Sequence, residues 1–163
     1  MRVDDSLRRG SPRRDGRESA RSGTTAPRGY RGTRDVSSVS APRILVIEDD
    51  PSVISVVEFV LDMAGFDAVF AGDGGTGVAS ARQTRPAVIL LDLGIPVLDG
   101  YGVCAALAED PATAAIPIVL MTGTAESASS ERLAKFPIRD VIVKPFSPKD
   151  LLARVQILVG SGG

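Results

Sequence analysis

Five short apolar runs, rich in Val and Ile and spaced along the chain from residue 44 onward, constrain what this sequence can fold into. The runs are Ile44–Ile47, Ala68–Ala71, Val88–Leu91, Ile118–Met121 and Val141–Val143. Most of them lack the apolar–polar alternation of a strand with one solvated face, which is typical of strands that are buried on both faces of a parallel sheet. We therefore expect five short strands, most of them fully buried.

The segments between these runs have helical length and helical patterning. Apolar residues recur at the spacing of one helix face at Val53, Val56, Val57, Val60 and Ala64, and again at Leu151, Leu152, Val155 and Leu158. Asp50-Pro51 and Ser147-Pro148 each supply an N-cap followed by proline, and Asp99 is a further candidate N-cap. Strands that alternate with helices predict an α/β fold, a doubly wound (βα)5 parallel sheet with the flavodoxin-like strand order 2-1-3-4-5.

Charge divides the chain near residue 41. Residues 1–41 hold ten arginines, no lysine and five acidic residues, whereas the remainder holds nine basic and fifteen acidic residues. We expect 1–41 to be a disordered Arg-rich N-terminal extension, 42–160 to be the folded domain and 161–163 to be a flexible C-terminus. We expect no nucleic-acid binding outside the Arg-rich extension.

The residue types that are scarce exclude several functions. The chain has no histidine and one cysteine, Cys104, so it cannot contain a Ser-His-Asp triad, an internal disulfide, or a metal site built from histidines or a cysteine cluster. It has no apolar run long enough to cross a bilayer, and its first residues lack the apolar core of a secretory signal. We expect a cytoplasmic protein with no membrane insertion.

Polar residues follow four of the predicted strands. They are Glu48, Asp49 and Asp50 after the first strand, Asp92 after the third, Thr122 and Gly123 after the fourth, and Lys144 and Pro145 after the fifth. The carboxyl ends of parallel strands meet at one edge of a sheet, where ligands of such folds bind. Crowded carboxylates favour a cation, and oxygen ligands select a hard ion such as Mg²⁺. A lysine beside them can hold a phosphate group.

Four segments at these strand ends resemble the signature blocks of response-regulator receiver domains. They are Ile44–Pro51, Leu90–Gly100, Ile118–Gly123 and Val141–Phe146, in the order found in that family. Asp49 and Asp92 are 43 residues apart, Thr122 lies 30 residues further on, and Lys144 another 22. The resemblance covers residues 43–160 and supports the same fold.

The resemblance implies a site and partners. Asp92 would accept a phosphoryl group from a sensor histidine kinase or a histidine phosphotransfer protein. The implied Mg²⁺ ligands are Asp49, Asp92, the backbone carbonyl of Gly94 and, mostly through water, Glu48; Thr122 and Lys144 would bind the phosphoryl group, with Gly123 and Pro145 in support. The chain would be a phosphoacceptor switch that catalyses only its own phosphorylation and dephosphorylation, not a metabolic enzyme.

Two positions depart from the family pattern. Val141 stands where the fifth strand usually carries the aromatic ring that is coupled to the inward swing of the Thr122-type hydroxyl. Gly94 brings no side chain near the acceptor, so we expect an open site. Because only a short Gly-rich segment follows the last helix, we expect a stand-alone regulator that signals by contact with an unknown downstream protein; homodimerisation is left open.

Parts of this sequence pattern also occur in proteins with three other functions. The same fold could serve as a phosphorylation-independent binding module, a pseudo-receiver. Gly72–Gly77 matches the G-x-G-x-x-G pattern of dinucleotide-binding domains, but that function leaves Glu48, Thr122 and Lys144 unexplained. A haloacid-dehalogenase-like phosphatase needs a second Asp two residues after its nucleophile, where this chain has Gly94.

Overall fold

The computed structural model describes residues 39–124, 131 and 133–162. The predicted N-terminal extension lies outside these residues up to position 38, and so does residue 163 of the predicted C-terminal tail. Most of the segment around Ser127–Lys135, where the alternation of strands and helices predicts a further helix, also lies outside them. The described strands and helices are β1 (Arg43–Ile47), α1 (Pro51–Met63), β2 (Asp67–Ala71), α2 (Gly74–Thr84), β3 (Val88–Asp92), α3 (Gly100–Glu109), β4 (Ile118–Thr122), β5 (Ile138–Val143) and α5 (Pro148–Gly160).

The strands form one parallel sheet with the order β2-β1-β3-β4-β5, which confirms the predicted topology. The inner strands β3 and β4 are buried along their whole length, and β1 is buried after its first residue. The edge strands β2 and β5 are mostly half-buried. Continuous apolar runs therefore mark the inner strands, as expected for strands covered on both faces.

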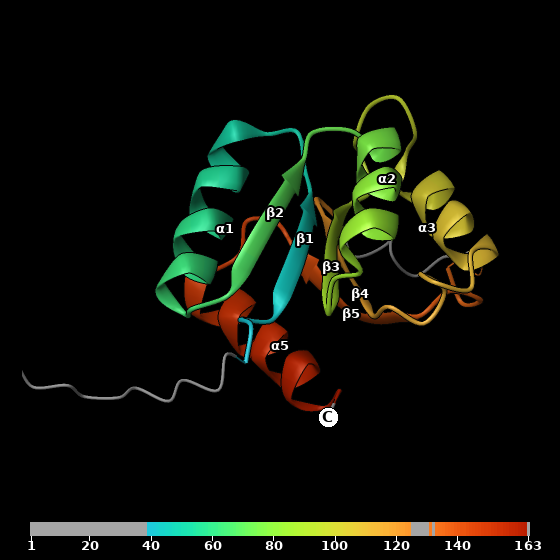
Figure 1. The fold of residues 1–163 in the computed structure, drawn as a ribbon. Coiled ribbons are helices and arrows are strands. Elements are labelled where there is room, and N and C mark those ends of the chain that lie inside the picture. Colours follow the sequence, from blue (N-terminus) through green and yellow to red (C-terminus); the bar gives the residue numbers. More distant parts are fainter. Residues whose placement is uncertain (1–38, 125–130, 132, 163) are drawn as a thin grey trace, which may run out of the picture. The chain divides into compact units, whose positions relative to one another are not determined.

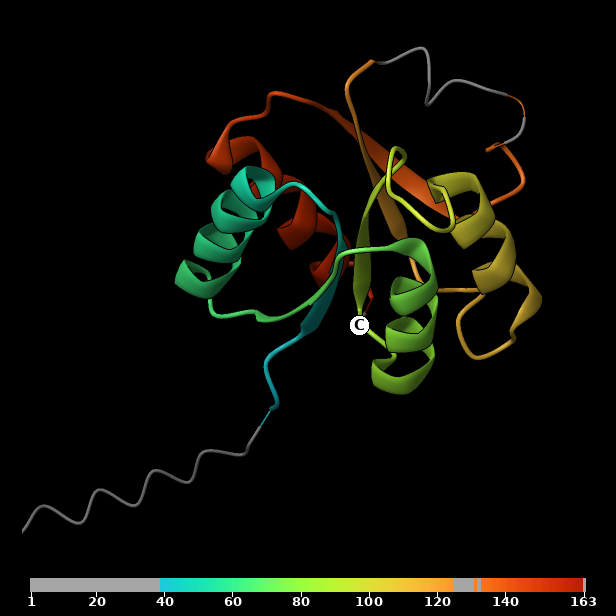
Figure 2. The same ribbon diagram turned by 90° about the horizontal axis from the view of Figure 1, so that it is seen from above.

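Helices cover both faces of this sheet. Figures 1 and 2 show α1 and α5 on one face and α2 and α3 on the other. Successive side chains of a strand point to opposite faces. Accordingly Ile44 and Val46 pack with the α1 and α5 cluster, whereas Leu45 and Ile47 pack with the α2 and α3 cluster.

The fifth strand starts earlier than its apolar run indicated. It begins at Ile138, which pairs with Ile118, and the next pair joins Asp140 to Val119. Arg139 is therefore the extra residue of a β-bulge. The two charged residues Arg139 and Asp140 interrupt the apolar run, so the sequence pattern does not indicate where β5 begins. An edge strand tolerates charges that an inner strand excludes.

The helix starts use the predicted caps. The carboxylate of Asp50 accepts a hydrogen bond from the backbone N–H of Ser52 at 2.8 Å, and Asp99 accepts one from Gly102 at 2.9 Å. At α5, the hydroxyl of Ser147 accepts one from the N–H of Asp150 at 3.1 Å. Such caps satisfy N–H groups that the first helical turn leaves unpaired. They hold the three strand-to-helix loops at the carboxyl edge of the sheet.

The glycines of the Gly72–Gly77 motif have a packing role in this fold. A Cβ added at Gly77 would lie 2.5 Å from Cδ1 of Ile47, and one added at Gly74 would lie 1.9 Å from the carbonyl oxygen of Leu98. These glycines let α2 approach β1 and the β3–α3 loop closely. The motif also follows edge strand β2, away from the β1–β3 switch point where open α/β sheets bind dinucleotides. Both observations count against the dinucleotide hypothesis.

Candidate functional site

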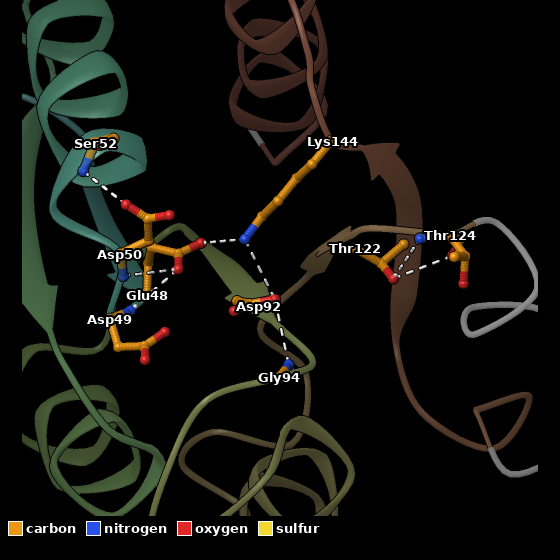
Figure 3. Close-up of polar contacts among 9 residues, drawn as sticks. All are labelled: Glu48, Asp49, Asp50, Ser52, Asp92, Gly94, Thr122, Thr124 and Lys144. Atoms are coloured by element: carbon orange, nitrogen blue, oxygen red, sulfur yellow. Dashed lines mark hydrogen bonds and ion pairs between the residues drawn. The ribbon is translucent and has the colours of Figure 1, made fainter.

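The carboxyl ends of β1, β3, β4 and β5 bring the predicted residues to one edge of the sheet (Figure 3). Glu48 follows β1 directly, Asp92 and Thr122 are the last residues of β3 and β4, and Lys144 follows β5 directly. The side chain of Lys144 contacts the carboxylates of both Glu48 and Asp92. Thr122 lies at the same edge, but its hydroxyl has a different partner.

Three carboxylates are crowded together at this edge. Oxygens of Glu48, Asp49 and Asp92 all lie within 4.8 Å of one another. Glu48 is 1% exposed and Asp92 is 9% exposed, whereas Asp49 is exposed to solvent. Like charges at this separation repel each other strongly when water is partly excluded, so the cluster attracts cations.

Lys144 supplies one positive charge to the three carboxylates. Its Nζ donates to Oε2 of Glu48 at 2.6 Å and lies 3.4 Å from Oδ1 of Asp92. Burial would lower the pKa of Lys144, but its hydrogen bond and charge contact with Glu48, together with the charge of Asp92, outweigh burial and raise that pKa. Lys144 is therefore held in its charged form, and the site retains negative charge for a divalent cation.

Glu48 is fixed by hydrogen bonds to both of its carboxylate oxygens. Oε1 accepts from the backbone N–H groups of Asp49 and Asp50, each at 3.1 Å, while Oε2 accepts from Lys144. Burial raises the pKa of Glu48, a shift that the hydrogen bond from Lys144 opposes. Because both oxygens already have donors, Glu48 suits a water-mediated contact with a metal better than a direct one.

The loop after β3 leaves one side of Asp92 open. The N–H of Gly94 donates to Oδ1 of Asp92 at 3.2 Å. A Cβ added at Gly94 would lie 3.8 and 3.9 Å from the two carboxylate oxygens of Asp92. Any side chain at position 94 would thus begin in contact with Asp92, and glycine leaves that space to a ligand or to water.

Thr122 is buried, with 4% of its surface exposed. Its hydroxyl donates to the backbone carbonyl of Thr124 at 3.1 Å and accepts from the N–H of Thr124 at 3.3 Å, as Figure 3 shows. Sequence reasoning did not find Thr124 as a partner. The contact uses only backbone atoms of Thr124, so no residue type in the sequence signals it.

Val141 occupies the position on β5 where the resemblance leads us to expect an aromatic ring. It pairs with Leu120, two residues before Thr122, so its side chain lies on the same sheet face as Thr122. There it packs against the cluster that contains Leu133. The Lys144–Pro145 peptide bond is cis. The supporting role of Gly123 stays a prediction.

Comparison with known proteins gives one family. The sequence profile of the response regulator receiver domain matches residues 44–156. The DNA-binding dual master transcriptional regulator RpaA of Synechocystis is 40% identical over 118 residues, which are 72% of this chain and 49% of that protein. The DNA-binding response regulator MtrA of Mycolicibacterium smegmatis is 38% identical over 114 residues, 70% of this chain and 49% of that protein. The chain thus spans about half the length of these relatives.

Solved structures agree with the sequence comparison. The receiver domain of a sensor histidine kinase from Pseudomonas aeruginosa, with magnesium coordinated in its active-site cleft, has a TM-score of 0.68 and 30% identity, covering 74% of this chain and 99% of that one. The chemotaxis response regulator CheY4 of Vibrio cholerae has a TM-score of 0.68 and 26% identity, covering 73% and 99%. None of the helices in the described part of the chain has the length and apolar composition needed to cross a bilayer.

Proposed function

The chain belongs to the response-regulator receiver domain family of two-component signalling, and from this premise we propose that it accepts a phosphoryl group on Asp92 from a phosphohistidine donor, with Mg²⁺ bound beside it. The observation that carries the proposal is the contact of Lys144 with both Glu48 and Asp92, at an edge where Asp49 adds a third carboxylate. These residues come from three strands and meet only in the fold.

The reaction requires little covalent chemistry from the protein. A carboxylate oxygen of Asp92 forms a bond to phosphorus while the phosphorus–nitrogen bond of the donor phosphohistidine breaks. Phosphoryl transfer is promoted mainly by positioning and by charge stabilisation. Lys144, whose Nζ lies 3.4 Å from Oδ1 of Asp92, would contact the oxygens of the transferred group. The open side at Gly94 leaves room for that group.

The donor set fits Mg²⁺. It consists of carboxylate oxygens, and Mg²⁺ prefers oxygen ligands and binds through one or two carboxylates plus phosphate oxygens. We assign direct contacts to Asp49, Asp92 and the carbonyl of Gly94, and a water-mediated contact to Glu48, whose oxygens already accept three hydrogen bonds. The ion would offset the negative charge that Lys144 alone leaves in place.

Thr122 would link phosphorylation of Asp92 to a change in the structure around the site. Its hydroxyl bonds to Thr124 in the structure, so reaching a phosphoryl group on Asp92 means breaking that contact. The exchange would couple phosphorylation to the segment that follows β4. Because Val141 offers no ring, we propose that the signal runs through this segment and not through an aromatic side chain on β5.

The output of the chain stays a prediction. The relatives RpaA and MtrA are DNA-binding regulators, and the chain corresponds to about half of each. We propose that this receiver domain signals through protein contact with a downstream partner, and that its catalysis is limited to its own phosphorylation and dephosphorylation. Stand-alone action, a cytoplasmic location and the absence of nucleic-acid binding outside residues 1–41 are likewise predictions.

Transfer from a labelled phosphohistidine protein tests the proposal. Wild type should acquire the label in the presence of Mg²⁺, Asp92→Asn should not, and Asp49→Asn should need far more Mg²⁺. Glu109→Gln makes the same acid-to-amide change at an exposed residue of α3, so this control should acquire the label as wild type does. If folded wild type takes no label from several histidine kinases and phosphotransfer proteins, the phosphoacceptor function is wrong and the pseudo-receiver alternative replaces it.

A further inference from the structure

Aromatic side chains line a groove beside β2, and the adjoining helix α1 leaves two large apolar side chains in solvent. On α1, Phe59 is 65% exposed and Met63 is 73% exposed. Phe59 lines a groove of about 600 Å³ together with Phe66 and Phe70. Three of the five phenylalanines of the chain therefore gather at one groove, between a helix and the edge of the sheet. Aromatic side chains at an accessible groove offer apolar contact area to a partner.

The outer edge of β2 has unpaired backbone groups. In a parallel pair, alternate residues turn both N–H and C=O toward the neighbouring strand. The N–H of Asp67 and the C=O of Ala71 bond toward the β1 side. The backbone groups of Ala68 and Phe70 consequently point outward, where none of the described strands pairs with β2. Ala68 and Phe70 are also lining residues of the groove.

The other edge of the sheet is protected, whereas this one is not. On β5, a bulge interrupts the register, and Asp140 is ion-paired with Arg154. Bulges and charges are the features by which natural proteins keep edge strands from pairing. Between its ends β2 has no charged residue, no proline and no register shift against β1. Its edge is therefore competent to pair with a further strand.

The rim of the groove is acidic. Glu58 and Asp62 line it, both are exposed, and neither has an ion-pair partner within the described ranges. Asp67, at the end of the groove, pairs with Arg43 at 2.7 Å. Residues 42–163 also carry more acidic than basic residues, nine basic against fifteen acidic. A partner for this surface should therefore be basic.

We propose that the β2 edge and the adjoining groove bind an extended basic peptide segment of a partner protein, which adds a strand to the sheet. The partner's backbone would pair with Ala68 and Phe70. On the face of the sheet that α1 covers, the partner's side chains would be basic, with their apolar stems against Phe59 and their charged ends toward Glu58 and Asp62. The side chains between them would be apolar and point to the opposite face. Strand addition gives affinity through the main chain and specificity through alternate side chains. This surface lies two strands away from Asp92 in the sheet order, so it is distinct from the phosphoacceptor site.

A capped hexapeptide of alternating arginine and valine is the probe. Titrated into the full ¹⁵N-labelled chain, it should shift the amide signals of Ala68 and Phe70 and slow their hydrogen exchange. A glutamate–valine hexapeptide should bind far more weakly. An arginine–valine peptide with N-methylated alternate amides, which cannot pair with an edge strand, should lose the exchange protection.

Two variants separate charge from strand pairing. Glu58→Lys should weaken binding by about two- to five-fold, the range for an exposed ion pair. Its matched control, Glu109→Lys on α3 at the other face of the sheet, should not. Ala68→Pro removes an outward N–H and should abolish the exchange protection at Phe70. If Ala68→Pro does not fold, the N-methylated peptide tests the same pairing on wild type.

Several outcomes would overturn the proposal. Signal shifts confined to other elements would place the peptide elsewhere. Equal binding of the glutamate peptide, or equal loss in Glu58→Lys and Glu109→Lys, would remove the acidic rim from recognition. A concentration-dependent dimer whose amide protection maps to Ala68 and Phe70 would make a second copy of the chain the occupant. None of these outcomes would alter phosphorylation of Asp92.

Discussion

At the scale of single residues, the balance of charge around Glu48 is the most consequential feature of the site. A carboxylate that is 1% exposed loses most of its hydration, and its charged form needs compensation. Lys144 at 2.6 Å and two backbone N–H groups provide it. Burial still raises the pKa of Glu48 above its ordinary value of 4.5, so compensation is incomplete. Stability of the metal-free protein should therefore depend on pH through this residue.

Lys144→Met should lower the free energy of unfolding at pH 7 in EDTA by about 2 kcal/mol, because it leaves a buried carboxylate without its cation. A carboxyl group whose pKa is raised on folding stabilises the folded protein fully below its unfolded pKa, and this contribution is lost as pH rises through the folded pKa. Without Lys144 the charged form of Glu48 is the costly one, so the loss in free energy of unfolding caused by Lys144→Met should shrink as pH falls from 7 toward 4.5. Urea unfolding at several pH values measures it; Lys149→Met, at an exposed lysine, should show no such trend.

Val97 has a strained backbone conformation. It has φ of 70° and is 88% exposed, and the N–H of Leu98 donates to the carbonyl of Pro96 at 2.9 Å across it. This is a γ-turn with positive φ at a β-branched residue, a strained combination. Because the Val97 side chain is mostly in solvent, little packing offsets the strain.

Val97→Asn should raise the free energy of unfolding by about 1 kcal/mol, since asparagine tolerates positive φ and valine does not. Val97→Thr keeps the β-branch and removes one exposed methyl group, so it should leave stability close to wild type. Chemical denaturation of the three proteins decides the matter. Equal stabilisation by both substitutions would show that exposed apolar surface, and not backbone strain, is the cause.

At the scale of elements, the close approach of α2 to β1 depends on a glycine within a helix. Gly77→Ala would improve helix propensity by about 1 kcal/mol. Its Cβ would nevertheless lie 2.5 Å from Cδ1 of the fully buried Ile47. Overpacking of this kind outweighs propensity, so we expect a net loss of about 1–2 kcal/mol in thermal or urea unfolding.

Gly160→Ala is the matched control for that substitution. Gly160 is the last residue of α5, and an added Cβ would meet nothing within 4 Å. This variant should be neutral or slightly more stable than wild type. If Gly77→Ala were stabilised to the same degree, the packing explanation for the glycine motif would be wrong.

Elements differ in how well the sequence predicts them, and the difference is physical. The inner strands β3 and β4 are buried on both faces, so nearly every residue in them is apolar and the run is visible. The caps at Asp50, Asp99 and Ser147 are local and were also predicted. The start of β5 was not, because its pairing partner Ile118 and its bulge are set by tertiary contacts.

At the scale of the whole molecule, the sequence predicted which residues form the site, but not which of their side chains contact one another. Parallel strands deliver their carboxyl ends to one edge, so the sequence placed Glu48, Asp92 and Lys144 together. It did not show that Lys144 lies closer to Glu48 than to Asp92, nor that the hydroxyl of Thr122 turns to Thr124. Those contacts depend on side-chain directions that spacing along the chain does not encode.

The most direct test of the phosphoacceptor function is intact mass after incubation with Mg²⁺ and acetyl phosphate, comparing wild type with Asp92→Ala. We expect wild type alone to gain the mass of one phosphoryl group, and EDTA to prevent the gain. Glu109→Gln should be modified as wild type is. An equal gain in folded Asp92→Ala, or a gain that EDTA leaves unchanged, would contradict the assignment of the acceptor or of the metal.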